Sequence, residues 1–439
     1  MVIEHHEIEF TRDGRVFDEA QVTGLLEKAG GYTDLLVLCH GWNNDKAEAS
    51  ALFDRLTKSL ERVTAANLVS GLEDRRMGAL RVFWPSKKFA DEDLIPGGGA
   101  ASATHENDEA LARLLEAMKH DPETLGGTER NEIREALLSE AQALAPSLSE
   151  DPAARERFVA ILRSVLDPAE AHADDGSDAF FTRPADELFA GLNGQVVAPG
   201  APKAGGATGV GSGGAAGLGD FLGGVGAAAR RLANYTTYYG MKSRAGIVGR
   251  VGLAPVLRRL RDRHPTLRLH LVGHSFGGRL VTVAAHDLPP RTHGVTLSLL
   301  QAAFSHNGLA DNFDENGRDG AFRALLAERR ASGPILITHT KNDTAVGIAY
   351  PLASRIARQA AAALGDENDP YGGMGRNGAQ HTPEVEETST LLEEAGQDYG
   401  FEAGKVYNLR ADRFVSSHSD VGGNQVASAI LMAVAATGA

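Results

Sequence analysis

The chain has 439 residues, of which 42% are hydrophobic and 23% charged, and its formal net charge is −14 at pH 7. This composition is typical of a globular protein with a sizeable core. The acidic balance argues against nucleic acid as the main partner, because binding to phosphates needs a basic face. The single cysteine, Cys39, excludes an intramolecular disulfide and gives no sign of an oxidising compartment.

Targeting signals are not evident in the chain. Residues 1–10 are acidic and lack the basic and apolar regions of a signal peptide. No run of 18 or more apolar residues occurs, so we expect no transmembrane helix. We therefore predict a cytoplasmic location, and export by a route without a cleavable signal stays open.

Strand and helix patterns alternate in the first 85 residues. Residues 2–10 alternate polar and apolar side chains as an edge strand does, and residues 15–17 could return as its hairpin partner. The apolar run at 34–39 is typical of a strand buried on both faces. A further strand is predicted at 80–86, and helices are predicted at 18–28 and 47–67.

The alternation stops between residues 86 and 230. Amphipathic patterns there predict helices at 105–120, 129–145 and 152–166. Residues 191–226 are rich in glycine and alanine, but they lack the lysine of a phosphate-binding Walker loop. We interpret 86–230 as one large, mainly helical cap or lid that contains a mobile segment.

The alternation resumes after residue 230. We predict strands at 267–272, 295–303, 334–340 and 405–409, helices at 241–263, 320–331, 344–363 and 421–434, and a long loop at 365–385. Strands separated by helices predict an α/β fold with a mostly parallel sheet and helices on both faces. Residues 1–85 and 231–439 would form this core.

One short motif stands between a predicted strand and a predicted helix. Gly273-His274-Ser275-Phe276-Gly277 follows an apolar run and precedes apolar residues at helical spacing. This context is typical of a nucleophile elbow, in which the serine sits on a strained turn and its hydroxyl projects above the sheet. Glycines flank the serine because side chains there would collide with neighbouring backbone. The alternative is that the motif occurs by chance in a glycine-rich chain and has no function.

A serine nucleophile needs a base that takes its proton and an acid that orients this base. In an open α/β sheet both partners follow later strands, in the order serine, acid, histidine. Asp343 lies three residues after the strand at 334–340, and His418 lies between the last strand and the last helix. We therefore predict Ser275, Asp343 and His418 as the catalytic residues.

Other interpretations of these positions stay open. Asp343 could be an ordinary helix N-cap, and His418 could be a surface histidine. Asp412 is the reserve acid and Asp420 a weaker one, whereas His381 is the reserve base in an irregular loop.

The oxyanion of an acyl-transfer reaction needs two preorganised N–H donors. We expect one from Phe276, the residue after the nucleophile, and the other from Trp42, in the His40-Gly41-Trp42 exit of an early strand. His40, Gly41 and His274 are predicted to line the substrate site. The alternative is a tight strand exit with Trp42 in the core, and both can hold because the backbone supplies the donor.

Together these residues resemble the α/β-hydrolase-fold serine hydrolases. His40-Gly41-Trp42-Asn43-Asn44 and Trp84-Pro85-Ser86 are similar to sequences in bacterial lipase-like members, and His-Ser-Asp-Val-Gly-Gly at 418–423 is similar to the histidine motif of some phospholipase-like hydrolases. The resemblance covers about 1–85 and 231–439 and implies an elbow, an oxyanion loop, an acid and a base at the residues above. The family cleaves esters, thioesters, amides and epoxides, so the fold alone does not identify the bond.

Other candidate sites carry weaker signals. Residues 311–317 resemble a calcium loop, but Arg323 stands where the bidentate glutamate should be. His5 and His6 lack a third ligand at metal spacing. The basic run at 258–263 ends a predicted helix, where it complements the helix dipole. We therefore expect no metal and no organic cofactor.

The sequence predicts a serine esterase or lipase that hydrolyses carboxylic esters of hydrophobic substrates through an acyl-enzyme on Ser275. One alternative is a phospholipase at a membrane surface, in transient contact with lipid, although the negative charge disfavours anionic bilayers. The other is a non-enzymatic interaction module on a hydrolase scaffold. The oligomeric state is not predictable from the sequence.

Overall fold

The computed structural model describes residues 3–86, 104–193, 224–290, 292–343, 356, 370–388 and 390–438. They contain a seven-stranded sheet in the order β1-β3-β2-β4-β5-β6-β7, and every neighbouring pair is parallel. The strands are β1 (Glu4–Glu9), β2 (Asp34–Cys39), β3 (Met77–Phe83), β4 (Arg268–His274), β5 (Val295–Leu300), β6 (Ile335–His339) and β7 (Val406–Arg410). This sheet confirms the predicted α/β class and its mostly parallel strands.

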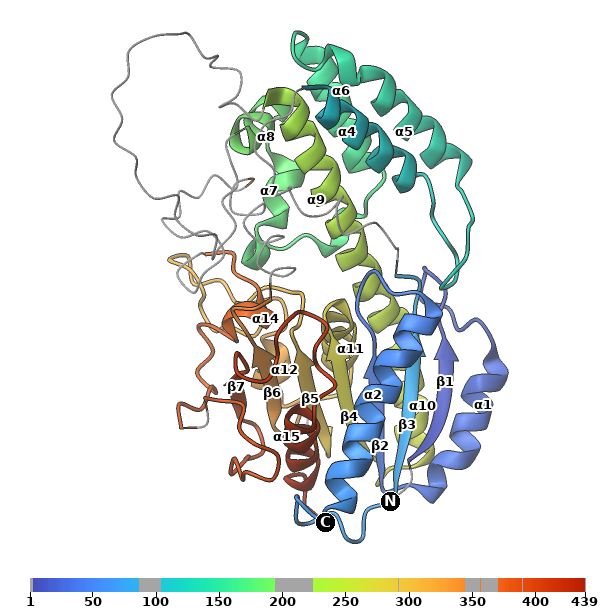
Figure 1. Cartoon of the computed structure of the whole chain (residues 1–439), viewed down its shortest axis with the longest axis vertical. Coiled ribbons are helices and arrows are strands. Elements are labelled where there is room, and N and C mark those ends of the chain that lie inside the picture. Colours follow the sequence, from blue (N-terminus) through green and yellow to red (C-terminus); the bar gives the residue numbers. More distant parts are fainter. Residues whose placement is uncertain are drawn as a thin grey trace.

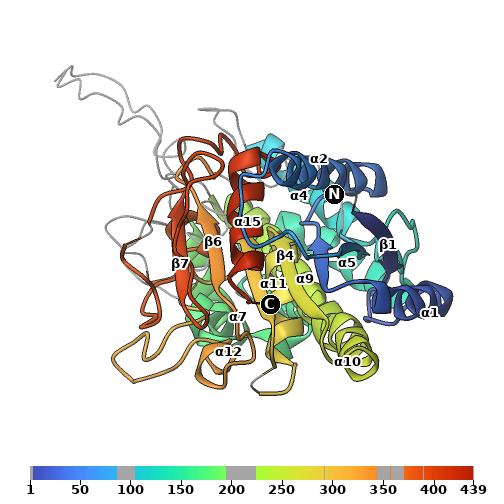
Figure 2. The ribbon, with the colours of Figure 1, turned by 90° about the horizontal axis from the view of Figure 1, so that it is seen from below.

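Helices cover both faces of the sheet (Figures 1 and 2). On one face α2 (Lys46–Ala65) and α15 (Asn424–Ala435) share one hydrophobic cluster with the strands. On the other, a second cluster contains residues of α1 (Glu19–Lys28), α10 (Ala254–Arg263) and α11 (Phe276–His286). Every residue of β2 is buried, as the continuous apolar run predicts for a strand covered on both faces.

A separate group of helices lies beyond the carboxyl ends of the strands (Figure 1). It contains α4 (Thr104–Met118), α5 (Glu132–Leu144), α6 (Pro152–Ser164), α7 (Ser177–Thr182), α8 (Ala185–Leu192) and α9 (Gly224–Ile247) as far as Tyr239. These helices share a hydrophobic cluster of their own, which includes Leu232 and Tyr239 of α9. The predicted boundary at residue 230 therefore falls inside the part of α9 that packs with the helical group.

Helix α9 joins this group to the core. It continues through a π-helical turn (Val248–Leu253) into α10, and Met241 and Ala245 already belong to the core cluster. At Gly249 the helix passes so close to α11 that a Cβ would lie 2.5 Å from the carbonyl oxygen of Leu280. Only glycine permits this approach.

Several local predictions differ from the structure. The helix predicted at 320–331 is reduced to α12 (Ala324–Ala327), and the hairpin return is a single antiparallel bridge between Phe10 and Val16. Helices α7, α8 and α14 (Met374–Asn377) and four short 3-10 turns were not predicted; the turns are Ala29–Gly31, Ala145–Ser147, Pro168–Glu170 and Ala173–Asp175. The predicted helix at 344–363, except Ile356, and residues 194–223 of the predicted mobile segment lie outside the described residues.

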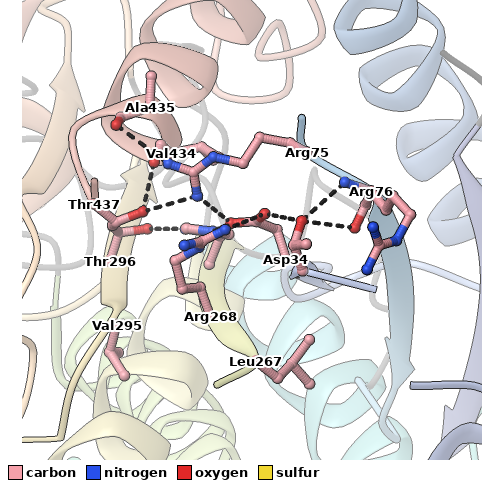
Figure 3. Close-up of polar contacts among 12 residues, drawn as sticks. Asp34, Arg75, Arg76, Leu267, Arg268, Val295, Thr296, Val434, Ala435 and Thr437 are labelled. Carbon is pink, nitrogen blue, oxygen red and sulfur yellow. Dashed lines mark hydrogen bonds and ion pairs between the residues drawn. The ribbon is translucent and has the colours of Figure 1, made fainter. Parts of the chain in front are cut away.

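A buried ionic cluster closes the amino-terminal edge of the sheet (Figure 3). The fully buried carboxylate of Asp34 accepts hydrogen bonds from Arg75 (2.7 Å), Arg268 (2.8 Å) and His270 (2.9 Å). Both arginines also donate to the carbonyl oxygen of Gly438, at 2.7 and 3.1 Å. The cluster therefore connects β2 and β4 to the segment after α15, at the edge opposite the candidate site.

Among the described residues, no helix combines the length and the apolar character that crossing a membrane requires.

Candidate functional site

The strand order reverses between β2 and β4, because the chain adds β3 and β1 on one side of this pair and β5, β6 and β7 on the other. In parallel α/β sheets, the crevice at the carboxyl ends of such a pair is where ligands bind. The residues that follow these two strands are His40-Gly41-Trp42 and Ser275. The topology therefore brings the predicted oxyanion loop and the predicted nucleophile to the same crevice.

Ser275 occupies a strained turn between β4 and α11. Its backbone has φ 56° and ψ −126°, a region that costs a residue with a side chain about 1–3 kcal/mol. A Cβ at Gly273 would lie 2.4 Å from the carbonyl oxygen of Gly277, and one at Gly277 would lie 2.4 Å from that of His40. The two glycines of the motif are therefore required by close backbone contacts, as the elbow interpretation predicts.

The predicted acid and base are in direct contact. Nδ1 of His418 lies 2.7 Å from Oδ2 of Asp343, whose side chain is fully buried. The carboxylate orients the ring with its proton on Nδ1, which leaves the lone pair on Nε2. Nε2 has no hydrogen-bond partner within the described ranges, and the His418 side chain keeps 21% of its surface exposed. This geometry would suit the general base that the sequence predicts at His418.

The reserve candidates are engaged elsewhere. Asp412 accepts hydrogen bonds from Oγ1 of Thr340 (2.7 Å) and the N–H of Lys341 (2.9 Å). Asp420 accepts from the hydroxyl of Ser416, and Nδ1 of His381 lies 2.9 Å from Oδ1 of Asn307. Of the candidate acids, Asp343 alone contacts His418 among the described residues.

His274 connects the turn at Ser275 to the loop of His418. Its Nε2 lies 2.8 Å from the carbonyl oxygen of His418, and the two imidazole rings are 4.7 Å apart. Burial lowers the pKa of His274 to about 3, so the ring is neutral and donates through Nε2. No hydrogen bond joins the hydroxyl of Ser275 to His418 in the described structure. Such bonds are often long in unliganded enzymes and shorten when substrate binds.

The loop after β2 packs directly against the elbow. A Cβ at Gly41 would lie 2.6 Å from Cβ of Ser275, and the rings of Trp42 and Phe276 are 5.9 Å apart. Because Phe276 is the first residue of α11, its N–H has no acceptor within the helix. The backbone at Phe276 and at Gly41-Trp42 therefore flanks the Ser275 side chain, where an oxyanion would develop.

His40 lies beneath this loop and has no exposed surface. Its Nδ1 lies 2.9 Å from the carbonyl oxygen of Gly41, and its Nε2 accepts a hydrogen bond from the N–H of Trp84 at 3.3 Å. Burial lowers the pKa of His40 to about 4, which keeps the ring neutral. Because both ring nitrogens are engaged, the geometry favours a supporting role for His40 over the predicted contact with substrate.

Three further contacts at the site were not predicted, because no local sequence pattern indicates them. The ring of Tyr238, on α9, lies 5.1 Å from that of Phe276. Arg376, from the loop predicted at 365–385, donates to the carbonyl oxygens of Lys341 (2.9 Å) and Asp343 (3.1 Å) and so holds the loop of the acid. Arg279, four residues after Ser275, pairs with buried Glu170 of the helical group at 2.6 Å.

Metal-ligating side chains do not gather in the described part of the chain: it contains no group of three or more His, Cys, Asp or Glu that could hold a metal ion. In the calcium-like loop at 311–317, the carboxylate of Asp314 accepts a hydrogen bond from Nε of Arg318 at 2.6 Å. The protein's own guanidinium therefore occupies the position of a cation.

Replacing Gly41 by alanine is expected to lower the rate of any reaction at Ser275 by about 100-fold. A shift of about 1 Å in the position of a reacting group has an effect of this size. The new methyl group would meet the Cβ of Ser275 and the backbone of His274, neither of which can move away as a flexible side chain would. Single-turnover kinetics would measure the loss. Gly24→Ala is the matched control, because a Cβ there meets nothing within 4 Å. Equal rates for the two variants would contradict the role of this loop.

Comparisons with models of protein families, with curated proteins and with solved structures found no match for this chain, so its function has to be inferred from the residues of the site.

Proposed function

We propose that this protein is a serine hydrolase of the α/β-hydrolase type, which cleaves carboxylic esters of hydrophobic substrates through an acyl-enzyme on Ser275. The observation that carries the proposal is the 2.7 Å contact between His418 and buried Asp343, in a loop that His274 ties to the strained, glycine-flanked turn at Ser275. A buried carboxylate that orients a histidine next to such a serine is the arrangement that makes a hydroxyl nucleophilic.

In the proposed reaction, the hydroxyl of Ser275 attacks the ester carbonyl while Nε2 of His418 accepts its proton. Asp343 stabilises the resulting imidazolium. The N–H of Phe276 and an N–H of the Gly41-Trp42 loop, for which Trp42 is the first choice, donate to the oxyanion. His418 then protonates the leaving alcohol, and a water molecule activated by the same histidine releases the acid. These steps use neither a metal nor an organic cofactor.

Aromatic side chains beside the elbow support a hydrophobic substrate. Trp42, Tyr238 and Phe276 form a connected set, with ring centroids 5.9 and 5.1 Å apart at Phe276. They come from the loop after β2, from α9 and from α11, so α9, which joins the helical group to the core, contributes one wall of the site. The net charge of −14 also disfavours an anionic substrate.

The cap is better described as a fixed wall than as a lid that opens as a whole. Glu170 pairs with Arg279 of α11 at 2.6 Å and with Arg250 of the π-helical turn at 2.8 Å. Breaking a buried ion pair costs about 3–5 kcal/mol. Moving the 3-10 turn Pro168–Glu170 away from α11 would break the Glu170–Arg279 pair and would therefore cost this free energy.

A labelled fluorophosphonate and a series of p-nitrophenyl esters from acetate to palmitate would test the proposal. We expect one covalent adduct, mapped to Ser275 by peptide mass spectrometry, and turnover with an optimum in acyl chain length. Adduct formation without ester turnover would redirect the assignment to thioesters or amides. A protein that neither reacts with the probe nor turns over any ester would be better described as an interaction module.

A further inference from the structure

An open cavity of about 180 Å³ lies where the helical group meets the core. Its walls come from the loop after β1, from the segment between α4 and α5, from α5 and from α9; they include Arg12, Asp121, Arg134, Thr237 and Arg244. Neither Ser275, Asp343 nor His418 lines it. Thr237, Met241 and Arg244 share one face of α9, whereas Tyr238 turns toward the elbow.

Positive charge exceeds negative charge on the walls of this cavity. Asp121 is shared by two of the three arginines, at 2.7 Å from Arg244 and 3.2 Å from Arg12. The other acidic residue on the wall, Asp167, caps a 3-10 turn by accepting from the N–H of Ala169 at 2.9 Å. The carboxylate of Asp121 therefore pairs with two guanidinium groups, and among the described residues the third arginine has no carboxylate in an ion pair with it.

Arg134 is that third arginine. It is partly buried and forms no ion pair with any residue that the structure describes. Its Nε donates to the carbonyl oxygen of Met118 at 2.7 Å and its Nη1 to that of Val165 at 3.0 Å. These neutral acceptors hold the guanidinium in place without compensating its charge. Burial lowers the pKa of Arg134 and lowers that of Arg244 to about 10, and the negative charge of Asp121 offsets this lowering only in part.

A buried hydroxyl on the same wall also lacks a partner. Thr237 is 6% exposed, and its Oγ1 forms no hydrogen bond with any described residue. Most buried hydroxyl groups in folded proteins are hydrogen-bonded, so an unpaired one beside a surplus cation indicates a missing acceptor. The hydroxyl itself is closed to solvent in this structure, although Thr237 lines the cavity. A turn of the side chain to the other χ1 rotamer that helices allow to threonine would let an anion in the cavity accept from this hydroxyl and balance Arg134 at the same time.

We propose that this cavity binds a phosphate group, held by Arg134 and Arg244 with Thr237 donating from α9. Guanidinium forks match the oxygens of phosphate, and a phosphate offers more acceptors than the two oxygens of a carboxylate. The volume is below the roughly 300–1,000 Å³ of sites for larger ligands. The ligand is therefore inorganic phosphate or the phosphate of a small monoester. The site is independent of the hydrolase proposal.

Isothermal titration of the full chain with inorganic phosphate, at constant ionic strength, tests this assignment. We expect saturable binding that chloride does not reproduce and that Thr237→Val weakens about tenfold, the effect of removing one hydrogen bond to a charged group. This substitution keeps the shape of the side chain and removes a hydroxyl without a partner, so the fold should not suffer. A parallel titration with glycerol phosphate shows whether the free ion or a monoester binds more tightly.

Arg134→Gln should also weaken binding, whereas Arg157→Gln in the same helical group should not. Arg157 is the matched control because it is half exposed and pairs with Glu140 on the surface, at 2.6 Å. Equal affinity of wild type and Thr237→Val, or a response to phosphate no larger than the response to chloride, would overturn the proposal. The readout is binding, so its failure would leave the assignment of Ser275 untouched.

Discussion

Replacement of Ser275 by alanine is expected to lower kcat for ester hydrolysis by at least about 10⁴-fold, the scale of loss when a triad nucleophile is removed. The reason is chemical, because a methyl group cannot form the acyl-enzyme. The structure should be unaffected, since the hydroxyl of Ser275 bonds to no described residue. Steady-state kinetics on the preferred p-nitrophenyl ester, together with circular dichroism, would measure both effects.

The matched control is Ser298→Ala, the same substitution at a buried serine in the middle of the neighbouring strand β5. Its activity should remain at the wild-type level. Asp343→Asn should lower kcat by a similar factor of about 10⁴, because the amide favours the wrong tautomer of His418. The double variant Ser275→Ala/Asp343→Asn should be no worse than Ser275→Ala alone, since residues that act as a unit are not additive. Losses that multiply would show that Asp343 acts independently of the serine.

Replacement of Asp34 by alanine is expected to reduce the free energy of unfolding by about 3–5 kcal/mol, the usual cost of removing one partner from a buried ionic cluster. The substitution leaves Arg75 and Arg268 next to each other, 5% and 11% exposed, without their shared carboxylate. Burial alone would raise the pKa of Asp34, but hydrogen bonds from His270 and Arg268 lower it well below its usual value. The charged form of Asp34 is thus the one that stabilises the fold.

Urea unfolding followed by tryptophan fluorescence would measure this loss. Asp54→Ala is the control, because Asp54 also pairs with an arginine, Arg81 at 2.6 Å, but is 49% exposed. Exposed pairs contribute about 0–1 kcal/mol, so this variant should unfold close to the wild type. The folded fraction of Asp34→Ala should keep its esterase activity, since the cluster lies at the opposite edge of the sheet. Equal urea midpoints for Asp34→Ala and Asp54→Ala would contradict a stabilising role of the cluster.

Sequence patterns were sufficient where short-range interactions decide the structure. The apolar run at 34–39 predicts β2 because a strand covered on both faces tolerates few polar residues. Helix α2 was also predictable, since its amphipathic pattern follows an Asp45–Glu48 capping box. The predicted helix at 320–331 was wrong in extent: its first residues form turns, in which Gly320 donates to the carbonyl oxygen of Ala310 and Phe322 to that of Gly308.

For the candidate site, the sequence predicted which serine, acid and histidine to consider and their order along the chain. The turn at Ser275 has a local cause, the close backbone contacts at Gly273 and Gly277. Asp343 and Asp412 both follow a strand, so no local pattern could decide which of them meets His418. The structure decides in favour of Asp343, because β6 and β7 are neighbours and Asp412 instead holds the turn at Thr340 and Lys341.

By itself, the sequence determined the α/β class, the positions of the strands and the elbow at Ser275, since side-chain periodicity and the steric demands of glycine act over a few residues. Only the tertiary structure decided which distant groups meet. Glu170 and Arg279 are 109 residues apart, and the Arg134 and Thr237 side chains share a cavity only because α9 packs against the helical group. Such contacts depend on how complete helices and strands pack, and no local pattern records that packing.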